Sequence, residues 1–134
     1  MAIMPAEQIS VSIARDYAAV YGFLAEPANF ALWAAGLADT LHRDEAGVWR
    51  AQGPSGEVTL QFTPENAFGI CDHRVLLPDG AEVYVPMRVI ANGAGAEVLF
   101  TLFRQPGMSD AVFARDIAWV ERDLAALKAL LEKA

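Results

Sequence analysis

The only dense group of ionisable side chains in a strand-like segment is Asp72-His73-Arg74. Asp72 or Arg74 could polarise or orient a polar group on a buried ligand; alternatively, the two form a structural ion pair at the rim of a cavity. His73 and Arg88 lie diagonally across a predicted hairpin and could act as an acid/base pair if their face lined the cavity. The alternative for these two is an exposed polar pair. Asp72, His73, Arg74 and Arg88 are therefore the candidate catalytic residues, and none of them is assigned a role.

Other residue patterns do not point to a metal, a cofactor or a nucleophile. The two histidines, His42 and His73, are far apart, and with the single cysteine, Cys71, they match no zinc or facial-triad spacing. No Gly-flanked elbow accompanies a serine or cysteine. The glycine-containing segment 92–95 joins two predicted strands, which indicates a hairpin loop and not a phosphate cradle. We expect no metal and no cofactor.

The composition indicates one globular domain over residues 1–134. Apolar residues make up 54% of the chain and charged residues 20%, and a single cysteine cannot form an internal disulfide. A net charge of −7 and scattered Arg and Lys argue against nucleic acid as a partner. The longest apolar stretch, 30–38, is too short to span a bilayer, and the first residues lack the features of a secretion signal. We expect a cytoplasmic protein with no integral membrane segment.

The order of the predicted elements favours an α+β fold. Residues 8–13 alternate apolar and polar side chains, which indicates a half-buried strand. Two short helices follow within residues 17–35, and turn residues then interrupt the chain every 8–15 residues, as in a hairpin meander. The strands predicted in this meander are 40–43, 48–51, 58–63, 70–77, 82–91 and 97–104. With residues 8–13 they give seven strands, and the first is expected to pair with a late one.

The last predicted element, a helix over residues 110–133, has the clearest pattern. Ser109 is a suitable N-cap, and Asp110 is favourably placed at the positive end of the helix dipole. One apolar face follows the helix at alternating steps of four and three residues. Its members are Phe113, Ile117, Val120, Leu124, Leu127 and Leu131. A helix this long needs a broad apolar partner, so we expect a curved antiparallel sheet wrapped around it, with a ligand cavity between the two.

Hairpin geometry predicts which side chains face that cavity. A two-residue turn at 79–80 would place Arg74 opposite Val85 and Asp72 opposite Met87. Asp72 and Arg74 would then be charged exceptions on an apolar inner face. A slip of one residue would exchange the two faces of this strand.

The next hairpin extends the same predicted inner face. A four-residue loop at 92–95 would place Met87 opposite Phe100 and Val89 opposite Val98. The ligand-binding candidates are Trp33, Trp49, Leu60, Phe62, Asp72, Arg74, Val85, Met87, Phe100, Ile117, Trp119 and Val120. The aromatic and aliphatic members could equally be plain core, because cavity walls are also core.

Four segments carry a resemblance to a known family: QISVSIARDYAAVYGFLAEPANFALW, GICDHRVLLPDGAEVYVPMRV, EVLFTLFRQPGMS and WVERDLAALKALLEK. They resemble the SRPBCC superfamily, the START-like or helix-grip proteins that include polyketide cyclase/dehydratase-like proteins and lipid-transfer modules. The resemblance extends from Gln8 to about Lys133, and its middle segments look like those of a bacterial subgroup. It implies a helix-grip fold, in which a seven-stranded antiparallel sheet grips the last helix and leaves a ligand tunnel. No Rieske cluster motif is present, which excludes the oxygenase branch.

Three functions are compatible with these observations. The first is binding or carriage of a small hydrophobic or aromatic ligand in the cavity, and the apolar inner face favours it. The second is a metal-free enzyme of polyketide cyclase/dehydratase type that acts on such a ligand through the candidate catalytic residues. The third is a protein-interaction module, such as a co-chaperone or stress-response partner, that uses the outer face of the sheet. Apolar residues on that outer face would also suit a homodimer.

Overall fold

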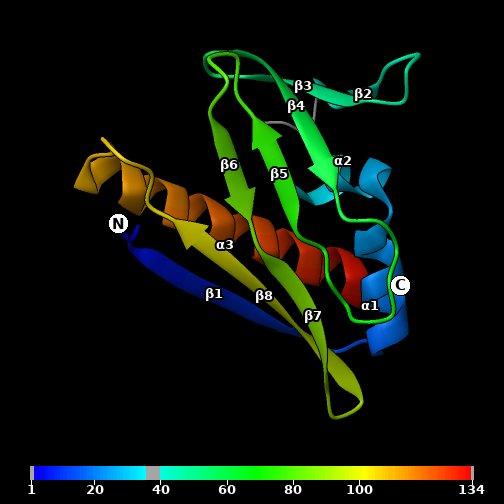
Figure 1. The fold of residues 1–134 in the computed structure, drawn as a ribbon. Coiled ribbons are helices and arrows are strands. Elements are labelled where there is room, and N and C mark those ends of the chain that lie inside the picture. Colours follow the sequence, from blue (N-terminus) through cyan, green and yellow to red (C-terminus); the bar gives the residue numbers. More distant parts are fainter. Residues whose placement is uncertain (1, 36–39, 134) are drawn as a thin grey trace.

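The computed structural model describes residues 2–35 and 40–133. In chain order the elements are β1 (Ala6–Ile13), α1 (Tyr17–Ala25), the short 3-10 helix η1 (Pro27–Asn29), α2 (Phe30–Trp33), β2 (His42–Arg43), β3 (Trp49–Gly53), β4 (Gly56–Phe62), β5 (His73–Leu76), β6 (Glu82–Val85), β7 (Met87–Asn92), β8 (Gly95–Phe103) and α3 (Asp110–Glu132) (Figure 1). The α+β architecture and the order of elements agree with the prediction.

The strands form two antiparallel sheets. One has the order β1-β8-β7, and the other has the order β2-β3-β4-β5-β6. The first strand pairs with the last along its whole length, from Ala6 opposite Phe103 to Ile13 opposite Ala96, as the sequence predicted. Helix α3 runs along the three-stranded sheet, and the five-stranded sheet rises beside it (Figure 1).

Pro86 explains why the structure has one more strand than the sequence analysis predicted. The segment 82–91 was expected to be continuous, but β6 ends at Val85 and β7 begins at Met87. Proline lacks the N–H that a strand interior needs. The carbonyl of Pro86 accepts a hydrogen bond from the Thr101 N–H at 3.0 Å, so the chain leaves one sheet and enters the other at this residue.

The predicted apolar face of α3 is buried unevenly. The Ser109 side chain caps the helix by accepting the Val112 N–H at 3.2 Å. Leu124, Leu127 and Leu131 are fully buried, whereas the N-terminal members of the same face are only half-buried. These half-buried members are Phe113, Ile117 and Val120. The sheet therefore grips the C-terminal half of the helix and leaves the N-terminal half partly uncovered.

Two apolar clusters form the core. The larger lies between the three-stranded sheet, α1 and α3, and the smaller lies on the inner face of the five-stranded sheet around Ala51, Val58 and Leu60. Phe30 of α2 packs against both clusters. Helix α2 thus joins the two halves of the interior.

The predicted register of the β5–β6 hairpin is wrong by one residue. His73, and not Arg74, lies opposite Val85, and Arg74 lies opposite Tyr84. The reason is the turn: Leu77 donates its N–H to Ala81 at 2.8 Å, which leaves three residues, 78–80, in the loop. Gly80 has a φ of +90°, a conformation that suits glycine in a loop of this length.

This slip exchanges the two faces of β5. Val75 lies opposite the buried Leu60 and packs on the smaller core cluster, so His73 and Val75 face inward. Asp72 and Arg74 consequently belong to the outer face, which corrects the prediction that they are exceptions on the inner one.

The predicted register of the β7–β8 hairpin is confirmed. Met87 lies opposite Phe100, and Val89 lies opposite Val98. The loop is shorter than expected, because Asn92 also pairs with Gly95. Gly93 has a φ of +58°, as the first loop residue of a type II′ turn requires.

Candidate functional site

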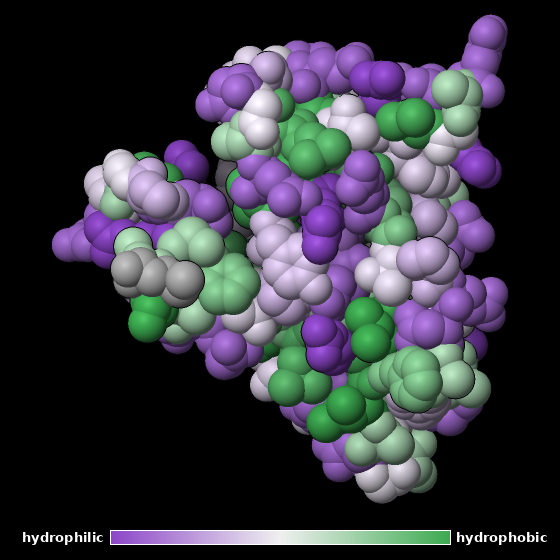
Figure 2. Space-filling model, in the orientation of Figure 1, coloured by the Kyte–Doolittle hydropathy of each residue, from purple (hydrophilic) through white to green (hydrophobic). Residues whose placement is uncertain are grey.

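A largely apolar cleft of about 540 Å³ opens between the N-terminal half of α3 and the five-stranded sheet. We call it the α3 cleft, and its lining residues are Ala35, Gln52, Gly53, Pro54, Val58, Val75, Leu77, Leu102, Asp116, Trp119, Val120 and Asp123. Figure 2 shows a notch in the molecular surface. On one side of it lie the N-terminus and the start of α3, and on the other side lies the five-stranded sheet. A volume of this size is typical of small-molecule sites in proteins.

The helical wall of the α3 cleft follows from helical periodicity. Asp116, Trp119, Val120 and Asp123 stand at positions i, i+3, i+4 and i+7, so they share one face of α3. Trp119 is 42% exposed, and the guanidinium of Arg115 lies 5.3 Å from the centre of its ring. A large aromatic side chain therefore stands at the edge of an apolar hollow, where a ligand can contact it.

Two carboxylates complete this wall. Asp123 accepts a hydrogen bond from the Ala35 N–H at 3.2 Å, and burial raises the pKa of its carboxyl group above the usual value. Asp116 forms an ion pair of 3.3 Å with its neighbour Arg115. The α3 cleft thus combines an apolar floor with acidic groups on its helical side.

Aromatic side chains fill the interior deeper under α2. Phe30 packs edge-on against Trp33, Phe62 and His73, with ring centres 5.4, 5.8 and 5.5 Å apart. The remaining cavity there, which Met87 also lines, has a volume of about 10 Å³. This is the lower limit for one water molecule, so the centre of the fold is packed and not an open tunnel.

A second hollow of about 470 Å³ borders this aromatic cluster and shares Pro27 and Phe62 with it. Trp49, Leu60 and Phe62 line it from the sheet, together with Ala25 and Pro27 from the helices. It is more polar than the α3 cleft, since Gln61, Thr59, Thr63 and Glu65 complete its wall.

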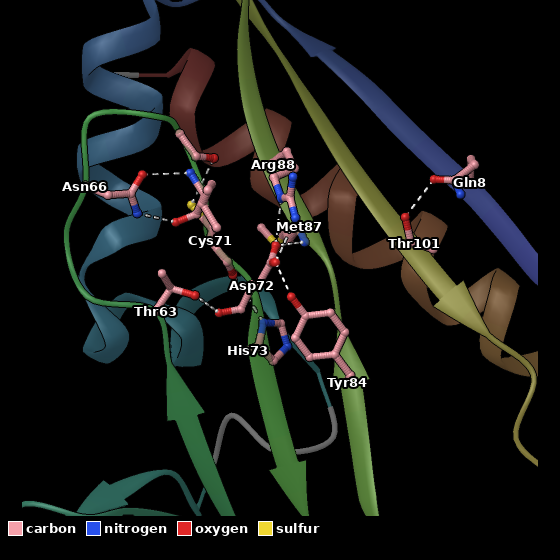
Figure 3. Close-up of polar contacts among 12 residues, drawn as sticks. Gln8, Thr63, Asn66, Cys71, Asp72, His73, Tyr84, Met87, Arg88 and Thr101 are labelled. Carbon is pink, nitrogen blue, oxygen red and sulfur yellow. Dashed lines mark hydrogen bonds and ion pairs between the residues drawn. The ribbon is translucent and has the colours of Figure 1, made fainter.

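The outer face of the sheet carries a hydrogen-bonded cluster around Asp72 (Figure 3). One oxygen of its carboxylate accepts the Met87 N–H at 2.8 Å and the Arg88 Nε at 2.9 Å. The other accepts the Arg88 Nη2 at 2.9 Å and the Tyr84 hydroxyl. Burial alone would raise the pKa of Asp72, but hydrogen bonds from Arg88, Tyr84 and the Met87 backbone lower it to about 2. The carboxylate of Asp72 is thus ionised, and both of its oxygens already accept two hydrogen bonds each.

The other candidate catalytic residues do not come together. Arg74 is exposed and forms an ion pair of 3.5 Å with Glu82. The ion pair between Asp72 and Arg74 that the sequence analysis considered is therefore replaced by one between Asp72 and Arg88. His73 is buried on the inner face, whereas Arg88 lies on the outer face, so the predicted acid/base pair is not formed. Burial lowers the pKa of His73 to about 4, which keeps the imidazole neutral among its aromatic neighbours.

The predicted ligand-binding residues are distributed over several environments. Trp119 and Val120 line the α3 cleft; Trp49, Leu60 and Phe62 line the second hollow; Trp33 and Met87 belong to the packed interior. Val85 is buried, Phe100 and Ile117 are half-buried, and Asp72 and Arg74 border an outer hollow of about 220 Å³.

Sequence reasoning missed most of the residues that line the α3 cleft. These are chiefly Val58, Val75, Leu77, Leu102, Asp116 and Asp123. The two aspartates could have been found from the helical period, because they flank Trp119 and Val120 on the same face. Val75 was assigned to the wrong face by the register error.

No group of three or more His, Cys, Asp or Glu side chains within 2–35 and 40–133 is arranged to hold a metal ion. None of the helices described in the structure is both long and apolar enough to cross a membrane.

Comparison with known proteins identifies the fold. The sequence matches no protein-family model and no curated protein. Among solved structures, Ara h 8.0201 superposes with a TM-score of 0.72 at 10% identity, covering 98% of this chain and 100% of that one. The Zhui aromatase/cyclase from a Streptomyces species gives a TM-score of 0.69 at 19% identity over 98% and 93% of the two chains. Aha1 from Colwellia psychrerythraea, solved as a dimer in solution, gives 0.68 at 16% identity over 96% and 97%.

These likenesses, together with a sheet that grips a long C-terminal helix, show the SRPBCC-type helix-grip fold. Because the identities between this chain and the three structures are below 20%, the shared feature is the fold.

Proposed function

We propose that the protein binds a small apolar or aromatic molecule in the α3 cleft. The observation that carries this proposal is a largely apolar hollow of about 540 Å³ that is bordered by an exposed tryptophan. By contrast, the described side chains under α2 are closely packed. Displacing water from such a surface favours binding by about 25 cal/mol for each Å² of apolar area that is buried. The ligand body would lie between Trp119 and the apolar side chains of β4 and β5.

Uneven burial of α3 supports the same location. The protein stabilises the C-terminal half of this helix through Leu124, Leu127 and Leu131, which are at most 3% exposed. The N-terminal half keeps an apolar face that is only half-buried. A ligand would complete the packing of this half.

A binding experiment with an uncharged dye tests the proposal. N-phenylnaphthylamine fluoresces strongly when it enters an apolar site, so titration of the protein should give a saturable increase with one site per chain. Replacing Val120 with Phe fills the α3 cleft from its helical wall and should reduce the affinity of the dye several-fold. The matched control is Ala118→Phe, which adds the same ring at an exposed position of the same helix.

Two results would contradict the proposal. The first is an absence of saturable dye binding by folded protein. The second is equal loss of affinity in Val120→Phe and Ala118→Phe, because the dye would then be bound elsewhere. Mass spectrometry of the protein under native conditions, after purification from its own host, would further detect any ligand that is retained and allow its release and identification.

A further inference from the structure

The ionisable side chains among the described lining residues of the α3 cleft are two carboxylates, Asp116 and Asp123. The other hydrogen-bonding side chains among them are neutral: the amide of Gln52 and the indole of Trp119. A carboxylate ligand entering this site would meet two like charges, and the chain as a whole adds to this repulsion with its net charge of −7.

Asp123 is the carboxylate with capacity left for a ligand. An ionised carboxylate offers about four acceptor positions. Asp72 shows such a group filled, with donors from Met87, Tyr84 and twice from Arg88. By contrast, the described structure gives Asp123 one hydrogen bond, from the Ala35 N–H at 3.2 Å.

The surroundings of Asp123 favour a positively charged partner. Burial disfavours the ionised form of this half-buried group, and an opposite charge placed against it would reverse that effect. Arg122 contributes a weaker attraction from the neighbouring position. At the other end of the same helical face, Arg115 already binds Asp116 at 3.3 Å and lies over Trp119, so Asp116 is the less available of the two carboxylates.

We propose that the ligand of the α3 cleft is an apolar or aromatic amine, held by its ammonium group at Asp123 and by its apolar body against Trp119 and Val120. This inference rests on the proposed function, since it names the chemical class of the ligand for the same cleft. A charge-assisted hydrogen bond from an ammonium to a partly buried carboxylate is short and strong compared with a neutral one. The same two aspartates disfavour fatty acids and other apolar anions.

A matched series of three naphthalene compounds tests this class. Naphthylmethylamine, naphthylmethanol and naphthoate share one aromatic body and carry a positive, a neutral and a negative head at pH 7. Isothermal titration calorimetry should show that the amine binds about tenfold more tightly than the alcohol, and that naphthoate binds more weakly than either. The preference for the amine should fall as salt is added.

Substitution of Asp123 locates the preference. Asp123→Asn keeps an oxygen that can accept the Ala35 N–H but removes the charge, so it should lower the affinity of the amine about tenfold and leave that of naphthylmethanol unchanged. Asp116→Asn should have the smaller effect. Glu121→Gln is the matched control, because it removes one carboxylate from an exposed position of the same helix and should leave the preference intact.

The outcomes separate the two proposals. Equal binding of all three compounds would overturn the amine inference and leave the apolar site standing. The amine inference would also fall if Asp123→Asn and Glu121→Gln had the same effect, because the amine would then respond only to net charge. If none of the three compounds bound, both proposals would fail together. Unchanged binding of naphthylmethanol shows in each variant that the cleft is still folded.

Discussion

The guanidinium of Arg88 grips the carboxylate of Asp72 with two hydrogen bonds of 2.9 Å each. The pair joins residues from two segments at the point where the chain passes from one sheet to the other, next to Pro86. Tyr84 and the Met87 N–H bind the same carboxylate from the flanking strands. Asp72 thus accepts the Met87 N–H directly after Pro86 and links the segment before β5 to β7.

Replacing Asp72 with Ala is expected to destabilise the protein by about 2–4 kcal/mol. The substitution leaves the buried Met87 N–H without its acceptor, and an unsatisfied buried donor costs about 1–3 kcal/mol. It also removes the hydrogen bonds of Asp72 to Arg88 and to Tyr84, which is 38% exposed and can turn to water. Because Arg88 is 48% exposed, water can solvate it and limits the total loss. Urea denaturation followed by circular dichroism measures the change in the free energy of unfolding.

Arg74→Met is the matched control for this prediction. Arg74 lies on the same face but is 53% exposed, and its ion pair with Glu82 is 3.5 Å long. Exposed ion pairs of this kind contribute about 0–1 kcal/mol. A loss in Arg74→Met as large as that in Asp72→Ala would show that the outer face depends on general charge balance and not on the Asp72 cluster.

Stability should decrease as the pH is lowered from neutral towards 4. Burial lowers the pKa of His73 in the folded state from 6.5 to about 4, so the unfolded chain takes up a proton before the folded one does. The stabilising contribution of the neutral imidazole is complete above pH 6.5 and is lost as the pH falls through this range, by roughly 3 kcal/mol in total. Denaturant titrations at a series of pH values measure this slope.

A second loss is expected at lower pH. The folded pKa of Asp72 is about 2, below its usual value of 3.8, so its contribution is present above pH 3.8 and disappears as the pH approaches 2. His73→Phe keeps an aromatic ring between Phe30 and Phe62 and should remove the higher-pH loss but not this one. His42→Gln removes the other imidazole from an exposed position and serves as the control. An unchanged profile in His73→Phe would refute the assignment.

Two glycines are expected to respond to alanine in opposite directions. Gly69 has a φ of +71°, and an added Cβ would lie 2.2 Å from the carbonyl oxygen of Val89. Gly69→Ala should therefore cost at least about 3 kcal/mol, because it also breaks the hydrogen bond from the Val89 N–H to the Gly69 carbonyl. Gly22 is an exposed residue inside α1 with no atom within 4 Å of an added Cβ.

Gly22→Ala should consequently stabilise the protein by about 0.5–1 kcal/mol through helix propensity. Thermal and urea unfolding of the two variants measure both signs. A neutral Gly69→Ala would mean that the segment before Asp72 moves freely, which would contradict the close packing of Gly69 on β7.

The sequence analysis predicted those features that depend on local patterns. The alternation of residues 8–13, the Ser109 cap and the periodic face of α3 depend on neighbours in the chain, and each is confirmed in its own element. The superfamily resemblance supplied the way these elements are assembled. The split at Pro86 could also have been predicted, because proline interrupts a strand wherever it lies inside one.

The candidate site was harder to predict because it depends on one residue of register. A two-residue turn at 79–80 would turn Asp72 to the interior, whereas the observed three-residue turn at 78–80 turns His73 to the interior. The sequence around Gly80 permits both turns. A cavity between the sheet and the last helix was expected, with Trp119 and Val120 among its candidate residues, but its place along the helix was not. The periodic face of α3 does not reveal which half of it the sheet will cover.

Trp119 and Leu124 should separate stability from binding on the same helix. Trp119 is 42% exposed, so Trp119→Ala should cost less than about 1 kcal/mol of stability while lowering the affinity for an uncharged aromatic dye about tenfold. Leu124 is 1% exposed, so Leu124→Ala should cost about 2–5 kcal/mol and leave dye affinity unchanged in the fraction that is folded. Paired denaturation and dye titrations measure both quantities for each variant. If Trp119→Ala bound the dye like the unaltered protein, the ligand would not lie in the α3 cleft, whatever the cost of Leu124→Ala.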